Sequence, residues 1–349
     1  NCLTPNNETA QCISVFSCPV LLPAAQTQKE FYNKSLCGGE AGFPHVCCGT
    51  LGTYITQQEI IKAPTERKLS KYNQVCGYQH SDDHYHTIND TALTEFPWFA
   101  KIKLKPKNPS IVAKTIYSLG FACSGSLISL QYVITSASCI SHRKYEPEIV
   151  RLGEYSLLNK TDCMEDSDVY ECSSNVQDLG IDQVIPHPQY QELGFFFAIN
   201  DIGLIRLNKS AEFTDYVRPI CVPYPDVPKL TVNDTLITVK LPENYSNVKP
   251  RLARQYVQDD ECRSYIQEMV KNIDNGGHMC GAAINATSKT CDGNNLGSSV
   301  TVSRRSRQGR KWYLVGIVSG RFANCILEDT NIYTKVSHYL DWINENLNL

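Results

Sequence analysis

The sequence lacks a long hydrophobic run, an excess of basic residues and any low-complexity tract. None of its apolar runs approaches the ~20 residues that a membrane-spanning helix needs, so we expect no membrane span. The formal net charge is −3, without the basic field by which nucleic-acid-binding proteins attract phosphates. The chain is 42% hydrophobic, with 20 glycines and 17 prolines among 349 residues. This composition excludes collagen, coiled coil and wholesale disorder.

Sixteen cysteines are the most informative residues that the chain does have. An even number this large favours secretion and complete pairing into disulfides, because the cytosol keeps thiols reduced. No signal peptide precedes Asn1 and Cys2, so we expect a mature, processed N-terminus. Eight Asn-x-Ser/Thr sequons are also typical of exported proteins. These candidate glycosylation sites are Asn7, Asn33, Asn89, Asn159, Asn208, Asn233, Asn244 and Asn285.

The cysteines concentrate at the front of the chain, where six fall within 48 residues. So short a segment buries little apolar surface, and disulfides must hold it together. Zinc binding is the competing interpretation, but Cys47 and Cys48 are adjacent and no Cys-x-x-Cys pair is present. The sequence therefore predicts a small disulfide-stapled domain over residues 1–49.

The next segment, residues 50–75, has no cysteine before the chain reaches Cys76, and its apolar residues are sparse. We interpret it as a linker, with a short strand over 54–61. The remainder, 76–349, contains many short apolar runs separated by Gly, Pro, Asn and Asp, which favours an all-β barrel or sandwich. The predicted strands are 98–104, 132–135, 148–152, 202–207, 235–239, 312–318 and 332–336, and the predicted helices are 260–272 and 337–347.

Several motifs then occur in a fixed order along this second part of the chain. They are Glu95-Phe-Pro-Trp98, Phe121-Ala-Cys-Ser-Gly-Ser-Leu-Ile128, Tyr132-Val-Ile-Thr-Ser-Ala-Ser-Cys139, Arg151-Leu-Gly-Glu-Tyr155, Asn200-Asp-Ile-Gly-Leu-Ile205, Arg218-Pro-Ile-Cys-Val-Pro223, Val315-Gly-Ile-Val-Ser319 and Ile332-Tyr-Thr-Lys-Val336. Together they resemble the chymotrypsin-like serine proteases, and the front six-cysteine pattern resembles the arthropod clip domain. The resemblance implies an all-β fold: a clip domain, then a chymotrypsin-like double β-barrel closed by a C-terminal helix.

The resemblance also implies how the cysteines pair, and it leaves no free thiol. The implied bridges are Cys2–Cys47, Cys12–Cys37, Cys18–Cys48, Cys76–Cys221, Cys123–Cys139, Cys163–Cys172, Cys262–Cys280 and Cys291–Cys325.

The positions that match the family's catalytic triad carry Ser138, Asp201 and Asn295. Triad chemistry needs a nucleophile, a general base and an acid that orients the base. A serine hydroxyl cannot accept a proton near neutral pH, so the base role at Ser138 is empty. The carboxamide of Asn295 is not a useful nucleophile, although Asp201 keeps the orienting position. Losing this machinery costs roughly 10⁶ in turnover, so the resemblance implies a pseudoprotease.

The activation switch and the specificity pocket are altered as well. Family zymogens are cut after a basic residue to free an Ile-Val-Gly-Gly amine, but no Lys or Arg lies between Cys76 and Lys101. The position whose carboxylate would meet that amine carries Asn294. Lys289 stands where trypsin-like members keep the aspartate of the specificity pocket. Gly320, Arg321 and Asn331 depart from the family's substrate edge as well.

An active protease with an unconventional nucleophile is the enzymatic alternative. Ser298 and Ser299 follow the lost nucleophile by three and four residues, and His142 follows the lost base by four. Proton transfer needs contacts of about 2.6–3.2 Å, and each displacement amounts to several ångströms, so we expect no rescue.

Two polar segments could each be interpreted as a metal site or, more simply, as a solvated loop. Glu154 is a candidate calcium ligand, since some family members bind calcium in the loop after this motif. The neighbouring acidic residues are Asp162, Glu165, Asp166, Asp168 and Glu171. A second cluster consists of His80, Asp82, Asp83, His84 and His86, which we interpret as a solvated loop because only local residues converge.

The basic residues Arg304, Arg305, Arg307, Arg310 and Lys311 crowd into one short stretch. A solvated loop between strands, an anionic-polymer patch, a docking patch for an acidic partner and a protease cleavage site all remain open. Arg67 and Lys68 in the linker are the favoured candidates for proteolytic cleavage, because nicking concentrates in exposed linkers.

The family's inactive members act by binding in arthropod haemolymph. The resemblance therefore implies a secreted, extracellular glycoprotein that serves as a cofactor or regulator in an innate-immune protease cascade. Prophenoloxidase activation, which leads to melanisation, and complement-like opsonisation are the candidate cascades. The implied partners are active clip proteases, prophenoloxidase or an opsonin, with no cofactor of its own beyond the calcium candidate. Adhesion to a microbial surface or glycan is the alternative binding function.

Overall fold

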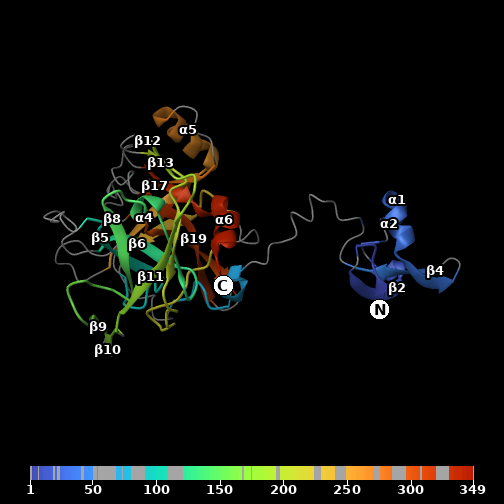
Figure 1. Cartoon of the computed structure of the whole chain (residues 1–349), viewed down its shortest axis with the longest axis horizontal. Helices are drawn as coiled ribbons and strands as arrows, with labels where there is room; N and C mark the ends of the chain where they lie inside the picture. Colours follow the sequence, from blue (N-terminus) through green and yellow to red (C-terminus); the bar gives the residue numbers. More distant parts are fainter. Residues whose placement is uncertain are drawn as a thin grey trace. The chain divides into compact units, whose positions relative to one another are not determined.

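A computed structural model describes most of the chain. The described residues are 2–6, 8–18, 20–21, 24–40, 43–49, 53, 68–72, 74–79, 91–108, 121–166, 169–173, 175–193, 197–223, 229–239, 249–270, 276–284, 296–306, 309–319 and 330–348. The chain divides into two compact units, Asn1–Arg67 and Lys68–Leu349 (Figure 1). The predicted strand over 54–61 lies outside the described residues.

The first unit is a small sheet with short helices. Its strand order is β1 (Cys2–Leu3), β2 (Thr9–Ser14), β4 (Phe43–Cys48) and β3 (Leu36–Glu40). Helices η1 (Val15–Ser17), α1 (Ala24–Thr27) and α2 (Lys29–Lys34) connect β2 to β3. The core is only a handful of side chains around Phe31 and Val46. Three disulfides supplement it, joining Cys2 to Cys47, Cys12 to Cys37 and Cys18 to Cys48.

The second unit contains two closed six-stranded barrels, which confirms the chymotrypsin-like fold. The first barrel runs in the order β11 (Gln177–Pro186), β14 (Gly203–Leu207), β7 (Tyr132–Thr135), β6 (Phe121–Leu127), β5 (Phe99–Pro106) and β8 (Tyr145–Leu152). The second runs in the order β15 (Thr235–Val239), β16 (Arg251–Val257), β17 (His278–Ala283), β20 (Thr330–Lys335), β19 (Gly309–Val318) and β18 (Ser299–Ser306). Every pairing is antiparallel, so short turns suffice to connect neighbours.

Shorter helices and strands lie outside the two barrels (Figure 1). They are η2 (Lys68–Tyr72), α4 (Ala137–Ile140), β9 (Cys163–Asp166), β10 (Val169–Cys172), β12 (Gln191–Leu193), β13 (Phe197–Ile199), α5 (Asp259–Met269), η4 (Val336–Tyr339) and α6 (Leu340–Asn346). Disulfides join Cys76 to Cys221, Cys123 to Cys139, Cys163 to Cys172 and Cys262 to Cys280. Cys291 and Cys325 lie outside the described residues. No described helix is long and apolar enough to cross a bilayer.

The main hydrophobic core extends across both barrels. Leu127 and Leu204 from the first barrel share one buried cluster with Leu314 from the second. The indole of Trp98 lies 6.3 Å from that of Trp312 across this junction. Ile343 of α6 belongs to the same cluster, so the C-terminal helix packs on this core. A continuous core of this kind holds the barrels in one fixed arrangement.

The folded unit starts earlier than the expected domain boundary at residue 76. Leu69 and Tyr72 of η2 are 3% and 8% exposed and belong to the main core. The backbone N–H of Lys68 donates to Asn344 Oδ1 at 3.0 Å, and its ammonium donates to the Leu347 carbonyl at 2.5 Å. The end of the expected linker is therefore part of the second unit, because its apolar residues belong to the main core and Lys68 is hydrogen-bonded to the C-terminal region.

Replacing Leu69 by Ala should reveal how much η2 contributes to the second unit. Deleting a buried leucine side chain costs about 2–4 kcal/mol when the surroundings cannot collapse. We expect a loss of that size in the free energy of unfolding of the full chain, measured with urea. The matched control is Val75→Ala, because Val75 is 43% exposed. Equal effects of the two substitutions would show that η2 is not part of the core.

Candidate functional site

Ser138 and Asp201 meet at the position that the family uses for its general base. The turn α4 follows β7 and carries Ser138, while Asp201 lies directly before β14. The backbone N–H of Ser138 donates to Asp201 Oδ1 at 2.7 Å, and its hydroxyl donates to Asp201 Oδ2 at 2.9 Å. The Asp201 side chain is buried, with the residue 1% exposed. The hydroxyl of Ser138 thus makes a carboxylate contact, and this group cannot act as a base.

The second barrel also contributes donors to Asp201. The hydroxyl of Ser319, directly after β19, donates to the same Oδ2 atom. The hydroxyl of Thr334 in β20 donates to the backbone carbonyl of Asp201 at 3.0 Å. A buried carboxylate is costly unless charge-assisted hydrogen bonds replace its hydration. Asp201 is therefore a structural joint between the two barrels.

The two alternative nucleophiles are buried and not accessible to a substrate. Ser298 and Ser299 are 0% and 2% exposed. The Ser298 hydroxyl finds no hydrogen-bond partner among the described residues, so no base activates it there. His142 accepts the N–H of Lys144 at 3.2 Å, and its ring packs 5.1 Å from the ring of Tyr145. The described geometry offers none of these groups as a replacement for the triad.

Some positions that the sequence singles out lie outside the described residues. They include Lys289, Asn294, Asn295, Gly320, Arg321, Arg307, Arg67 and the histidine cluster at 80–86. Among the sequons, Asn33, Asn159, Asn208 and Asn233 are described and exposed, as N-glycosylation requires, while Asn7, Asn89, Asn244 and Asn285 are not described. Lys68 is tied to the C-terminal region by the two hydrogen bonds given above, so cleavage beside it requires η2 to unwind.

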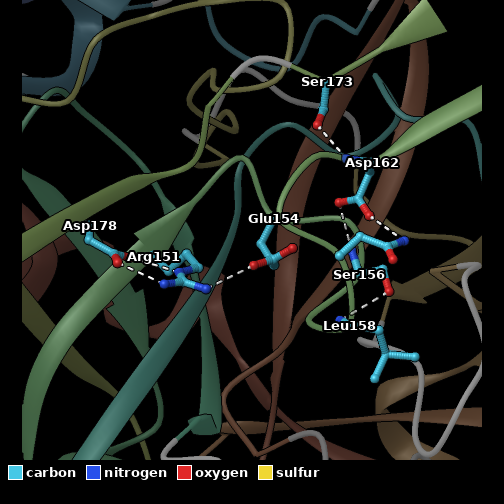
Figure 2. A network of polar contacts seen from close by, with 8 residues as sticks. Arg151, Glu154, Ser156, Leu158, Asp162, Ser173 and Asp178 are labelled. Carbon is cyan, nitrogen blue, oxygen red and sulfur yellow. Dashed lines mark hydrogen bonds and ion pairs between the residues drawn. The ribbon is translucent and has the colours of Figure 1, made fainter.

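The candidate calcium ligand Glu154 is the buried member of a network of ion pairs that extends to the surface (Figure 2). Arg151 donates to Glu154 Oε2 at 3.1 Å and binds Asp178 through two contacts of 2.7 Å. The Glu154 side chain is 2% exposed, and its Oε1 has no hydrogen-bond partner among the described residues. Burial raises the pKa of Glu154 despite the contact with Arg151. Arg151 lowers the pKa of Asp178 instead, because that carboxylate is far less buried.

Asp162 is the second buried carboxylate in this region. Its Oδ2 accepts the N–H of Ser156 at 3.0 Å, and its Oδ1 accepts the Asn159 amide at 3.3 Å (Figure 2). Calcium takes six to eight oxygen ligands. The described part of the chain holds no group of three or more metal-ligating side chains, and Glu171 binds Tyr216 instead, at 2.8 Å. Glu154 and Asp162 alone would therefore need carbonyls and waters to complete a calcium site.

The four described residues of the basic stretch lie at strand ends. Arg304 and Arg305 lie at the end of β18, and Arg310 and Lys311 lie at the start of β19. The two pairs face each other across the ladder, with Arg304 opposite Lys311 and Arg305 opposite Arg310. Paired strands resist proteases, which need an extended and accessible segment, so this geometry disfavours the cleavage interpretation.

Sequence reasoning missed a second buried ionic cluster between the barrels. Lys249 and Glu95 are each 3% exposed, and the Lys249 ammonium donates to the Glu95 carbonyl at 2.7 Å. Arg251 pairs with the Glu95 carboxylate at 3.4 Å. The Lys249 ammonium also lies 5.4 Å from the centroid of the Tyr155 ring. Lys249 stands in no recognisable motif, so no sequence signal indicates that it is buried.

The raised pKa of Glu154 predicts a specific pH dependence of stability. The folded chain binds the Glu154 proton more tightly than the unfolded chain. The resulting stability is present below the unfolded pKa of about 4.3 and is lost as pH rises through the folded value. We expect wild type to lose stability relative to Glu154→Gln over that interval, measured by urea unfolding in chelator.

The exposed Glu212 provides the control substitution Glu212→Gln, which should not change this slope. Calcium that binds Glu154 favours its ionised form and would abolish the slope in wild type. An unchanged slope at saturating calcium would rule out Glu154 as a ligand.

Comparisons with known proteins agree with this fold and domain order. The family model described as Trypsin matches residues 88–343, and that described as Regulatory CLIP domain of proteinases matches residues 2–48. Phenoloxidase-activating factor 1 of Holotrichia diomphalia is 33% identical over 359 residues, which cover 99% of this chain and 93% of that protein. Phenoloxidase-activating factor 3 of the same organism is 31% identical over 360 residues, with the same coverage.

A solved structure shows the same fold over nearly the whole chain. The Drosophila Grass clip serine protease of the Toll pathway aligns with a TM-score of 0.59 at 20% identity, covering 98% of this chain and 96% of that one. At this identity the likeness concerns the fold alone. The family models and the relatives above supply the assignment: this chain belongs to the trypsin family of serine proteases and carries a regulatory clip domain.

Proposed function

We propose that this protein is a non-catalytic member of its family and acts by binding. The observation that carries the proposal is the contact of Ser138 with Asp201. The Ser138 hydroxyl donates a hydrogen bond to the carboxylate that would orient an imidazole in a catalytic triad. General-base catalysis needs a group that takes the nucleophile's proton. Neither Ser138 nor the buried Ser298 supplies that chemistry, and the sequence carries Asn295 where the family has its nucleophile.

The activation pathway is absent from the sequence too. A new N-terminus stabilises the oxyanion hole of this family only where a carboxylate receives it, and the matching position carries Asn294. No basic residue between Cys76 and Lys101 offers the usual cut. These losses are independent of the triad, so a single change of one triad position would not restore turnover.

The relatives suggest the setting in which the protein acts. Two proteins at 33% and 31% identity over nearly the whole chain are named phenoloxidase-activating factors. We infer a secreted cofactor or regulator of an innate-immune protease cascade, with an active clip protease or prophenoloxidase as its partner. The disulfides and the exposed sequons support an extracellular location.

A reconstituted cascade tests this function. Purified prophenoloxidase and an active clip protease are mixed with or without the full chain, and phenoloxidase activity is followed. We expect the chain to change that activity at least about twofold, in either direction, while cleaving no peptide amide by itself. Ser298→Ala is the matched control and should behave as wild type, because the buried Ser298 hydroxyl has no hydrogen-bond partner among the described residues and takes part in no proton transfer. No change in phenoloxidase activity, or hydrolysis by the chain alone, would contradict the proposal.

A further inference from the structure

The disulfide between Cys163 and Cys172 differs from the other described bridges in its accessibility. Both of its cysteines are exposed. In every other described bridge, at least one of the two cysteines is half-buried or buried. Thiol–disulfide exchange begins when a thiolate reaches a bridge sulfur, so access decides which bridge reacts first. Among the described bridges, the one between Cys163 and Cys172 is therefore the best placed to react with an external thiol.

The strands that this disulfide joins form a two-stranded sheet of their own at the periphery of the second unit (Figure 1). β9 and β10 have four residues each. We call these two strands and their disulfide the β9–β10 ribbon. An isolated pair of strands is at best marginally stable in water. The disulfide is therefore the main constraint that keeps β9 and β10 paired.

The β9–β10 ribbon gains little from apolar packing. None of its described side chains belongs to a hydrophobic cluster. Tyr170 is 71% exposed. The register places Cys163 directly opposite Cys172, and Tyr170 lies on the same face because it precedes Cys172 by two residues. This face of the ribbon is turned to solvent and presents the disulfide there.

The described polar contacts that attach the ribbon lie at its base. The Tyr216 hydroxyl is 2.8 Å from Glu171 Oε1 and 3.0 Å from the Cys172 carbonyl. The N–H of Asp162 donates to the Ser173 hydroxyl at 3.2 Å (Figure 2), and the N–H of Ser173 donates to the Asp162 carbonyl at 2.7 Å. Asp162 is 4% exposed. Because Asp162 is held independently of the bridge, separation of the strands should remain within residues 163–172.

Three other bridges of the second unit are protected by the hydrophobic clusters that contain them. They are Cys76–Cys221, Cys123–Cys139 and Cys262–Cys280. A reductant reaches a buried bridge only after the surrounding core opens, so the stability of the fold opposes the reaction. The bridge of the ribbon also has the smallest sequence separation of the seven described bridges, at nine residues. Breaking it releases the least chain, so the rest of the unit should stay folded.

We propose that the Cys163–Cys172 bridge is a thiol–disulfide exchange site, which a dithiol reductant opens and oxidation closes again. One thiolate of the dithiol attacks a bridge sulfur and forms a mixed disulfide, and the displaced cysteine takes up a proton. The second thiol of the dithiol then displaces the other cysteine. The dithiol leaves as a disulfide after giving up two electrons and two protons, which convert the bridge into two thiols.

Reduction has a structural consequence for the surface of the second unit. Without the bridge, the marginal strand pair separates, and the fixed position of the exposed Tyr170 is lost. The oxidised chain presents this face in one conformation, and the reduced chain does not. The site goes beyond the proposed binding function and does not depend on it, because neither the exchange reaction nor its readout involves a partner protein or catalysis.

Timed reduction of the native full chain tests the site. The chain is incubated with dithiothreitol, free thiols are alkylated with iodoacetamide at intervals, and peptide mass spectrometry measures alkylation at each cysteine. We expect Cys163 and Cys172 to be alkylated at least about tenfold faster than Cys12 and Cys37. The latter bridge is the internal control, because Cys12 is exposed and Cys37 is half-buried. Equal rates for these two bridges, or simultaneous reduction of all described bridges, would overturn the proposal.

Hydrogen–deuterium exchange of the same samples measures the structural consequence. Reduction should speed exchange of the amides within 163–172 at least about tenfold and leave those of β7 unchanged. C163S/C172S should show the fast exchange without reductant and respond no further to it. The matched control Tyr170→Ser changes an exposed side chain of the ribbon, keeps the bridge and should retain slow exchange. Thermal unfolding verifies that both variants are folded, and the wild-type measurement does not depend on them. Amides that stay protected in the ribbon after both cysteines are alkylated would contradict the proposal.

Discussion

The buried carboxylate of Asp201 is the constraint on which the arrangement of the two barrels depends. A charged group that is 1% exposed must recover its lost hydration from hydrogen-bond donors. Those donors come from α4 of the first barrel and from the end of β19 in the second, through Ser138 and Ser319. The chain retains these hydrogen bonds to Asp201 but carries Ser138, which cannot accept a proton, at the position of the general base. On the proposed function, the same carboxylate serves the fold without serving catalysis.

Most of the interactions that hold the two barrels together lie away from the triad positions. The continuous core around Trp98 and Trp312, the disulfide-anchored segment at Cys76 and the buried Glu95–Lys249 cluster all hold the barrels together. None of them needs a working triad. On the proposed function, the exposed surface of the second unit provides recognition. A rigid scaffold with a preformed contact surface is what a binding cofactor requires.

Local sequence pattern predicted the elements whose side chains face one continuous core. Strands 132–135 and 235–239 were predicted with the bounds that the structure shows for β7 and β15, because their residues are apolar and turn residues flank them. Strand β11 is mostly half-buried or exposed and β16 is interrupted by arginines, so neither shows a clear alternation. Helix η2 was missed because Leu69 is buried in the core while its neighbour Lys68 is held by Asn344, 276 residues further along the chain, and local pattern carries no such information.

In the candidate site, too, some contacts follow from the sequence and others depend on tertiary packing. The resemblance placed Ser138 and Asp201 together, and the structure brings them into contact. The donors from Ser319 and Thr334 depend on how the barrels pack, and the contact of Arg151 with Asp178 depends on the β8–β11 pairing. The buried Glu95–Lys249 cluster is not visible in the sequence either, because it joins residues 154 positions apart along the chain.

The most direct test of the central claim is covalent labelling with a serine-directed fluorophosphonate. The full chain is treated before and after cleavage by a trypsin-like protease, and adducts are counted by intact-mass spectrometry and mapped by peptide sequencing. The account predicts no adduct in either state, because Asn295 stands at the family's nucleophile position and the neighbouring Ser298 and Ser299 are buried. A stoichiometric adduct at a single serine, Ser298 or Ser299 above all, would show that the chain assembles a nucleophile and would contradict it.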